Sequence, residues 1–173
     1  MRTRVVLAAF VLGLVAVGAA VAGLNHNWSV HLNTAMQVPV NASKGQGQAM
    51  FRLSSDGTGI DYKLIGSNIE NVFMAHIHQG TPGVNGPIVV WLYPSTAQAP
   101  GPAGSGRHDG VLSEGTIRAS ELTGPLAGRP LSDLVALMNG GGAYVNIHTN
   151  DGIAPLNTGP GDLFPGEIRG DIH

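Results

Sequence analysis

The sequence contains no cysteine. Disulfides and thiolate metal sites are therefore excluded, including the mixed His and Cys site of blue-copper proteins. Charge is also scarce, because only 12% of the residues are Asp, Glu, Lys or Arg, and the nine Lys and Arg are scattered along the chain. Without a basic cluster, we expect no nucleic-acid partner. The sequence also lacks a G-x-S-x-G turn, so no residue set argues for an enzyme.

Glycine and proline are abundant, with 26 and 11 residues, and they separate short apolar runs. This pattern is typical of an all-β chain with many turns. We predict an antiparallel, Greek-key-like β-sandwich with one short helix, built as a single domain. The predicted strands outside the histidine segment described below occupy residues 28–38, 49–53, 60–64, 115–119, 143–149 and 167–173, with a hairpin turn at 54–59 and an exposed loop at 94–110.

Residues 130–139 form the one predicted helix. Ser132 is its expected N-cap, Asp133 suits its positive end, and Gly140 can end it. A helical spacing of apolar residues predicts a buried stripe made of Leu131, Leu134, Val135 and Met138. We expect this helix to lie across an open end of the sandwich.

Residues 1–22 predict a secretory signal peptide, which leaves 23–173 as the folded domain. Two arginines precede an apolar stretch that ends in a small-x-small cleavage site, Ala-Val-Ala at 20–22. The alternative is an uncleaved membrane anchor, since residues 5–24 are about long enough to span a bilayer at ~20 residues. We therefore expect a secreted or periplasmic protein whose membrane contact is limited to an uncleaved signal segment.

Residues 71–93 contain two histidines one residue apart, then a turn rich in Gly and Pro, then an apolar run. Alternate side chains of a strand share a face, so His76 and His78 point together while the apolar residues between them face the core. The turn at 80–87 reverses the chain. Residues 88–93 are predicted to form a central, well-buried strand.

A third histidine, His148, lies on the polar face of the predicted strand at 143–149. We expect His76, His78 and His148 to meet outside the core, with His31 as a candidate fourth ligand if the first strand lies beside the others. Imidazole nitrogens suit both copper and zinc, so a metal site for either ion is predicted. The alternative is that these histidines bond backbone or carboxylate groups and hold the strand ends, with no metal or other cofactor.

A charged pair, Glu167 and Arg169, shares the outward face of the last predicted strand. Such a pair either anchors a ligand carboxylate or a sugar, or it is a structural ion pair or meets charges across the sheet. The sequence leaves both interpretations open.

Three motifs follow one another along the chain: AHIHQGTPGVNGPIVVWL, then LTGPLAGRPLSDLVALMNGGGAYVNIHT, then PGEIRGDI. Together they resemble the CHRD domain, the module named after chordin and also found singly in bacterial exported proteins. The resemblance spans about residues 30–172 and implies extracellular binding or scaffolding, with an unknown extracellular or periplasmic partner. One departure is Gln37 in MQVPV, where the family usually has an acidic residue.

An H-x-H pair on a strand, joined by a histidine from a distant strand, is also similar to the copper-ligand pattern of Cu/Zn superoxide dismutase, another Greek-key β-sandwich. The chain lacks that enzyme's cysteines and a counterpart of its His-rich zinc loop, so we expect no dismutase activity. Two functions are therefore predicted. The first is a non-catalytic binding or scaffolding module, and the alternative is a copper- or zinc-binding protein.

Overall fold

The computed structural model describes residues 27–94 and 99–173, so the predicted signal peptide lies outside the described residues. The strands are β1 (Asn27–Asn33), β2 (Gln46–Leu53), β3 (Ile60–Glu70), β4 (Val72–Gln79), β5 (Ile88–Tyr93), β6 (Arg107–Ile117), β7 (Ala143–Thr149) and β8 (Ile168–Ile172). The helical elements are η1 (Thr34–Met36), η2 (Ala119–Glu121), η3 (Gly124–Leu126) and α1 (Leu131–Asn139). None of the helices in the described part of the chain is long and apolar enough to cross a membrane.

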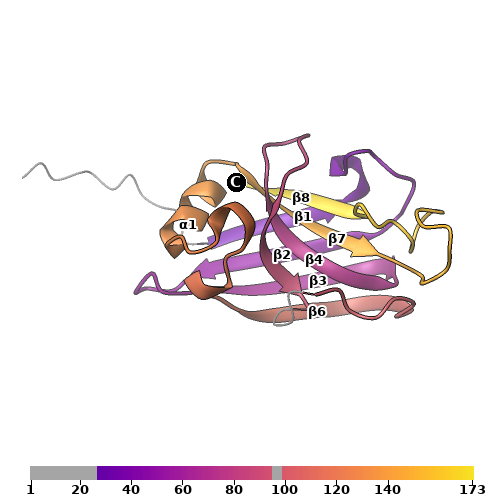
Figure 1. Cartoon of the computed structure of the whole chain (residues 1–173), viewed down its shortest axis with the longest axis horizontal. Helices are drawn as coiled ribbons and strands as arrows, with labels where there is room; N and C mark the ends of the chain where they lie inside the picture. The colour runs from indigo at the N-terminus through magenta and orange to yellow at the C-terminus, as the bar shows by residue number, and fades with distance from the viewer. Residues whose placement is uncertain (1–26, 95–98) are drawn as a thin grey trace, which may run out of the picture.

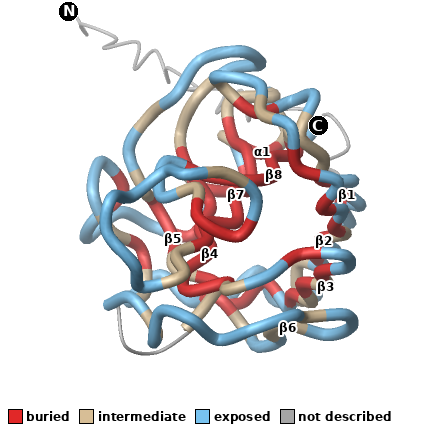
Figure 2. Tube along the Cα trace, turned by 90° about the vertical axis from the view of Figure 1, so that its right-hand side faces the viewer, coloured by how far each residue is buried: buried red, intermediate tan, exposed pale blue. Residues whose placement is uncertain are grey.

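All eight strands belong to one antiparallel sheet with the order β5-β4-β7-β8-β1-β2-β3-β6. The sheet curls until its two end strands, β5 and β6, approach each other, so it forms a nearly closed, barrel-like sandwich (Figures 1 and 2). The hydroxyl of Tyr62 on β3 helps to join these ends, because it donates to the Leu92 carbonyl on β5 at 2.9 Å and lies 3.0 Å from Ser113 Oγ on β6. The predicted all-β, antiparallel fold with one short helix is confirmed.

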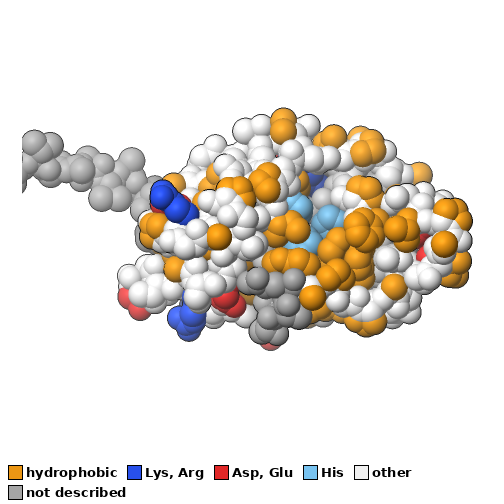
Figure 3. Space-filling view, in the orientation of Figure 1, with side chains coloured by type: hydrophobic (Ala, Val, Ile, Leu, Met, Phe, Trp, Pro, Cys, Tyr) orange, Lys and Arg blue, Asp and Glu red, His pale blue; other side chains and the backbone are white. Residues whose placement is uncertain are grey.

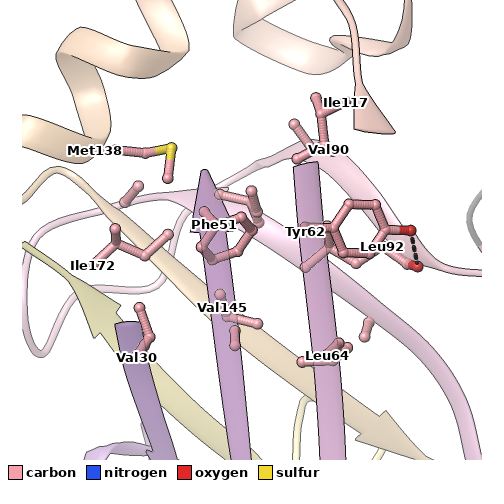
Figure 4. Packing of buried hydrophobic residues seen from close by; sticks show 14 of the residues in the cluster. Val30, Phe51, Tyr62, Leu64, Val90, Leu92, Ile117, Met138, Val145 and Ile172 are labelled. Carbon is pink, nitrogen blue, oxygen red and sulfur yellow. Dashed lines mark hydrogen bonds between the residues drawn. The ribbon is translucent and has the colours of Figure 1, made fainter. Parts of the chain in front are cut away.

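The core lies inside the curled sheet and is filled by alternate residues of the strands. Figure 4 shows side chains from β1, β2, β3, β5, β7 and β8 pointing toward one another, with Met138 of α1 above them. The predicted hairpin is also confirmed, because β2 pairs with β3 across the turn at 54–59. Period-2 alternation of polar and apolar residues is a reliable guide here since one face of each strand is buried.

The helix α1 lies at one end of the sheet (Figure 1) and buries all four residues of its predicted stripe. Gly140 ends it, and Asp133 lies in its first turn, as predicted. The prediction of Ser132 as the N-cap was wrong. Pro130 occupies that position in an extended conformation and offers no side-chain cap, since a proline with φ near −65° can lead directly into a first helical turn.

Three strand predictions need correction. β1 ends at Asn33 rather than at residue 38, because the Asn33 side chain accepts from the Met36 amide and starts the 3-10 turn η1. β5 is the end strand of the sheet and not a central one, and its buried residues are covered by the curling of the sheet rather than by pairing on both sides.

The third correction concerns β6, which spans Arg107–Ile117 rather than residues 115–119. It takes in the last part of the loop predicted at 94–110. β6 is an end strand with few buried residues. Backbone pairing with β3 holds it in place, so its sequence has no apolar alternation to reveal it.

Candidate metal centre

The three predicted histidine ligands lie together on neighbouring strands. β4 pairs with β7, and the register places Met74 opposite His148 and His76 opposite Asn146. The imidazoles of His76, His78 and His148 therefore share the face that points away from the core. One nitrogen from each ring lies within 4.8 Å of the others.

This outer face is covered rather than open to water. The β4–β5 loop (80–87) and the β7–β8 loop (150–167) fold over it, and the three histidines are only 0%, 7% and 5% exposed in chain order. Arg169 is fully buried and holds the first loop. It donates to the Thr81 carbonyl at 3.0 Å and to the Val84 carbonyl at 3.1 Å, and pairs with Asp171 at 2.8 Å. Arg169 thus serves as a structural anchor of the site's cover.

Glu167, the other member of the charged pair, is also buried and does not pair with Arg169. Its carboxylate accepts hydrogen bonds from Thr149 Oγ1 at 2.6 Å, from the Gly161 amide at 2.8 Å and from Ser43 Oγ. These contacts tie the end of the β7–β8 loop to β7 and to the segment between β1 and β2. Both members of the pair therefore have structural partners. Arg169 forms an ion pair with Asp171, and Glu167 is held by hydrogen bonds.

Hydrogen bonds to backbone carbonyls determine which ring nitrogen carries the hydrogen in two of the imidazoles. Nδ1 of His78 donates to the Gly86 carbonyl at 2.9 Å, and Nδ1 of His148 donates to the Phe164 carbonyl at 2.8 Å. Since a neutral imidazole carries one N–H, the Nε2 atoms of both rings have a free lone pair. An outer carbonyl that fixes the tautomer and orientation of a histidine is the usual support of a metal ligand.

The spacing of the nitrogens is close to that of a coordination site. His76 Nδ1 lies 3.3 Å from His148 Nε2, and two tetrahedral ligands bound at 2.0–2.1 Å stand about 3.4 Å apart. Without a metal, His148 Nε2 can only accept, so His76 Nδ1 donates and leaves His76 Nε2 buried without a partner, like Nε2 of His78. A nitrogen of His78 lies within 4.8 Å of this pair and supplies the third member of the group.

Burial keeps all three imidazoles neutral, which is the form that binds metal. Burial, aided by the neighbouring histidines, lowers the pKa of His76 to about 2. Burial lowers the pKa of His148 to about 4, and it also lowers the pKa of His78, although the Gly86 carbonyl opposes that shift. The cluster is therefore uncharged at neutral pH.

Aromatic rings enclose the histidines. Trp91 on β5 meets the His76 ring edge to face, with centroids 4.2 Å apart. Tyr144 stacks on His78 at 4.9 Å, and the Arg169 guanidinium lies 3.5 Å from the Tyr144 ring centroid. Because Tyr144 belongs to the strand between those of His78 and Arg169, its ring separates the two and fixes the position of His78.

The candidate fourth ligand, His31, does not join this cluster. It is exposed on β1 opposite Gln48, and the described ligand group contains only the other three histidines. β1 is separated from β7 by β8, so the condition that the first strand lie beside the histidine strands is not met.

Sequence reasoning assigned no role to Gln37, which proves to be a support of the site's cover. It is 2% exposed, and its amide donates to the Gly166 carbonyl at 3.0 Å. Gly166 has φ of 131°, and a Cβ there would overlap the amides of Gln37 and Asn146. The departure from the family's acidic residue was the sequence signal that could have marked this position.

In the space-filling view, histidine atoms are visible in the middle of a face, between hydrophobic side chains (Figure 3). Most charged side chains in this view lie toward the end that carries α1. The exposed large hydrophobic residues on the loops that flank the cluster are Val84, Ile153, Leu156 and Phe164.

The fold and the cluster define the class of protein: an antiparallel, barrel-like β-domain with three converging histidines under its outer loops. A profile of the CHRD domain matches residues 28–154, which include all three histidines. The chain therefore belongs to the CHRD family, as its motifs indicated. No curated protein and no solved structure matches the chain. The sheet extends beyond the matched residues through β8.

Proposed function

We propose that this CHRD protein is exported and binds a copper or zinc ion through His76, His78 and His148. The observation that carries the proposal is the convergence of three neutral imidazole nitrogens within 4.8 Å. Two of the rings are held by backbone carbonyls at Nδ1, so each keeps its lone pair on Nε2. A purely structural role would pair every buried nitrogen, whereas Nε2 of His76 and Nε2 of His78 both lack a hydrogen-bond partner within the described residues.

A metal titration tests the proposal. The protein starting at Gly23, which retains every described strand, is titrated calorimetrically with zinc(II), copper(II) and, under anaerobic reducing conditions, copper(I). We expect one ion per chain to bind tightly. The double variant His76→Ala, His78→Ala should lose this binding, while His31→Ala, which removes an exposed histidine, should keep it. Absence of binding for all three ions, or equal binding by the double variant, contradicts the proposal.

The second candidate function is the interaction module that the family resemblance implies. The specific observation in its favour is the apolar border around the histidines, made by exposed side chains on both flanking loops. Exposed apolar groups gathered on one face are typical of protein contacts. The partner is expected to be extracellular or periplasmic, and the two functions are compatible on one molecule.

A further inference from the structure

The cluster offers a metal ion no negative charge. Its three potential ligands are neutral imidazoles. Within the described residues, no carboxylate belongs to this group. The charged side chain that faces His78 through the Tyr144 ring is Arg169, whose charge is already paired with Asp171 at 2.8 Å. A bound ion would therefore keep its full charge inside a buried site.

The groups behind the ligands do not supply the missing charge either. In many zinc sites a carboxylate accepts the second N–H of a ligating histidine. Here the acceptors for His78 and His148 are the uncharged backbone carbonyls of Gly86 and Phe164. Because the cost of moving an ion out of water rises with the square of its charge, a divalent ion costs roughly four times as much as a monovalent one to bury in this site.

A methionine, Met74, is the strand neighbour of these histidines. Met74 is directly opposite His148 in the β4–β7 register and shares the outer face with His76. Its side chain is 8% exposed and lies outside the hydrophobic core cluster. Directly paired residues place their Cβ atoms about 5 Å apart, within reach of a long, flexible side chain. Thioether ligands favour copper(I) over harder, divalent ions.

We propose that this site selects copper(I), bound by His76, His78 and His148 with the thioether of Met74 as a soft fourth ligand. The inference rests on the proposed metal-binding function and specifies its ion. It accounts for a buried, charge-free ligand set, in which a monovalent ion is cheaper to bury than zinc(II) or copper(II).

The test compares affinities for copper(I) and zinc(II) in the protein starting at Gly23. Copper(I) is measured anaerobically against a chromophoric copper(I) chelator, and zinc(II) against a chromophoric zinc chelator. The variant Met74→Leu keeps the side-chain volume and removes the sulfur. The matched control, Met50→Leu, changes an exposed methionine on β2. Thermal unfolding of each variant reports whether the fold is kept.

We expect copper(I) to bind more tightly than zinc(II) by at least about a hundredfold, since both charge and ligand softness favour it. Met74→Leu should weaken copper(I) binding by about ten- to a hundredfold, the range found for groups that support a metal site. It should leave zinc(II) binding unchanged, and Met50→Leu should change neither.

Two results overturn the inference while the proposed metal function stands. One is zinc(II) or copper(II) binding at the histidines as tightly as copper(I). The other is a folded Met74→Leu protein with unchanged copper(I) affinity. If no ion binds at all, the proposed function itself fails, so the two failures are distinguishable.

Discussion

At the scale of single residues, the site depends on imidazoles that the fold keeps neutral. His76, His78 and His148 are buried under two loops, and burial disfavours the charged imidazolium. Each ring has at least one nitrogen that the backbone does not use. The same burial that keeps these groups neutral also links the stability of the metal-free protein to pH.

The pH dependence of unfolding should show this linkage. The folded-state pKa is about 2 for His76 and about 4 for His148, below the unfolded value of 6.5. The unfolded chain therefore takes up protons that the folded chain cannot. The histidine contribution is fully present above pH 6.5, and stability should fall from there toward pH 4, by on the order of 1 kcal/mol per pH unit for each histidine.

Urea unfolding of the metal-free protein between pH 7.5 and about 4.5 measures this slope. The control His31→Ala, which removes an exposed histidine, should keep the wild-type slope, and the His76→Ala, His78→Ala variant should reduce it. A wild-type stability that is flat over this range would contradict the burial of neutral imidazoles.

At the scale of elements, the cover of the site depends on β8. Arg169 extends from this strand and binds two carbonyls of the β4–β5 loop, and one residue of that loop, Gly86, provides the carbonyl that orients His78. Gly86 in turn donates its amide to the Tyr144 hydroxyl at 3.0 Å. The position of His78, one of the proposed ligands, therefore depends on a strand about ninety residues further along the chain.

Replacing Arg169 with Lys should loosen this loop. A single ammonium cannot reproduce the planar fork that reaches Thr81, Val84 and Asp171. We expect faster amide hydrogen exchange in residues 80–87 and a metal affinity reduced by about ten- to a hundredfold. The control Arg129→Lys changes the exposed arginine of the Arg129–Asp133 ion pair at the start of α1. It should alter neither measurement. Unchanged exchange in the loop of Arg169→Lys would show that other contacts hold it.

At the scale of the whole molecule, the curled sheet brings its two end strands together. Its end strands β5 and β6 are far apart in the pairing order, and the Tyr62 hydroxyl bridges them from β3. Closure covers the buried residues of β5, and the pairing of β5 with β4 places Trp91 opposite His76. The shape of the sheet and the environment of the site are thus connected.

Tyr62→Phe should weaken this closure. The Leu92 carbonyl would lose its donor in a buried place, at a cost of about 1–3 kcal/mol in the free energy of unfolding. Chemical denaturation measures the loss, and Tyr93→Phe, at a half-buried tyrosine on β5, should stay within about 0.5 kcal/mol of wild type. Equal effects of the two substitutions would argue against a bridging role for the Tyr62 hydroxyl.

The sequence by itself determined which side of each regular strand faces the core. Alternation placed His76 and His78 on one face and His148 on a polar face, because burying one side of a strand forces a period of two. The helix α1 and the β2–β3 hairpin followed from equally local signals. The family could be recognised from motifs within these same segments.

Only the tertiary structure decided which strands are neighbours. Pairing β4 with β7 joined His148 to the other histidines, while placing β8 between β7 and β1 left His31 outside. The β7–β8 loop has no periodic pattern of apolar residues. The sequence therefore could not predict that this loop covers the histidines or that Gln37 and Glu167 hold it in place. Such contacts join residues more than a hundred positions apart. Such long-range contacts depend on how all the strands are assembled, which no local pattern in the sequence encodes.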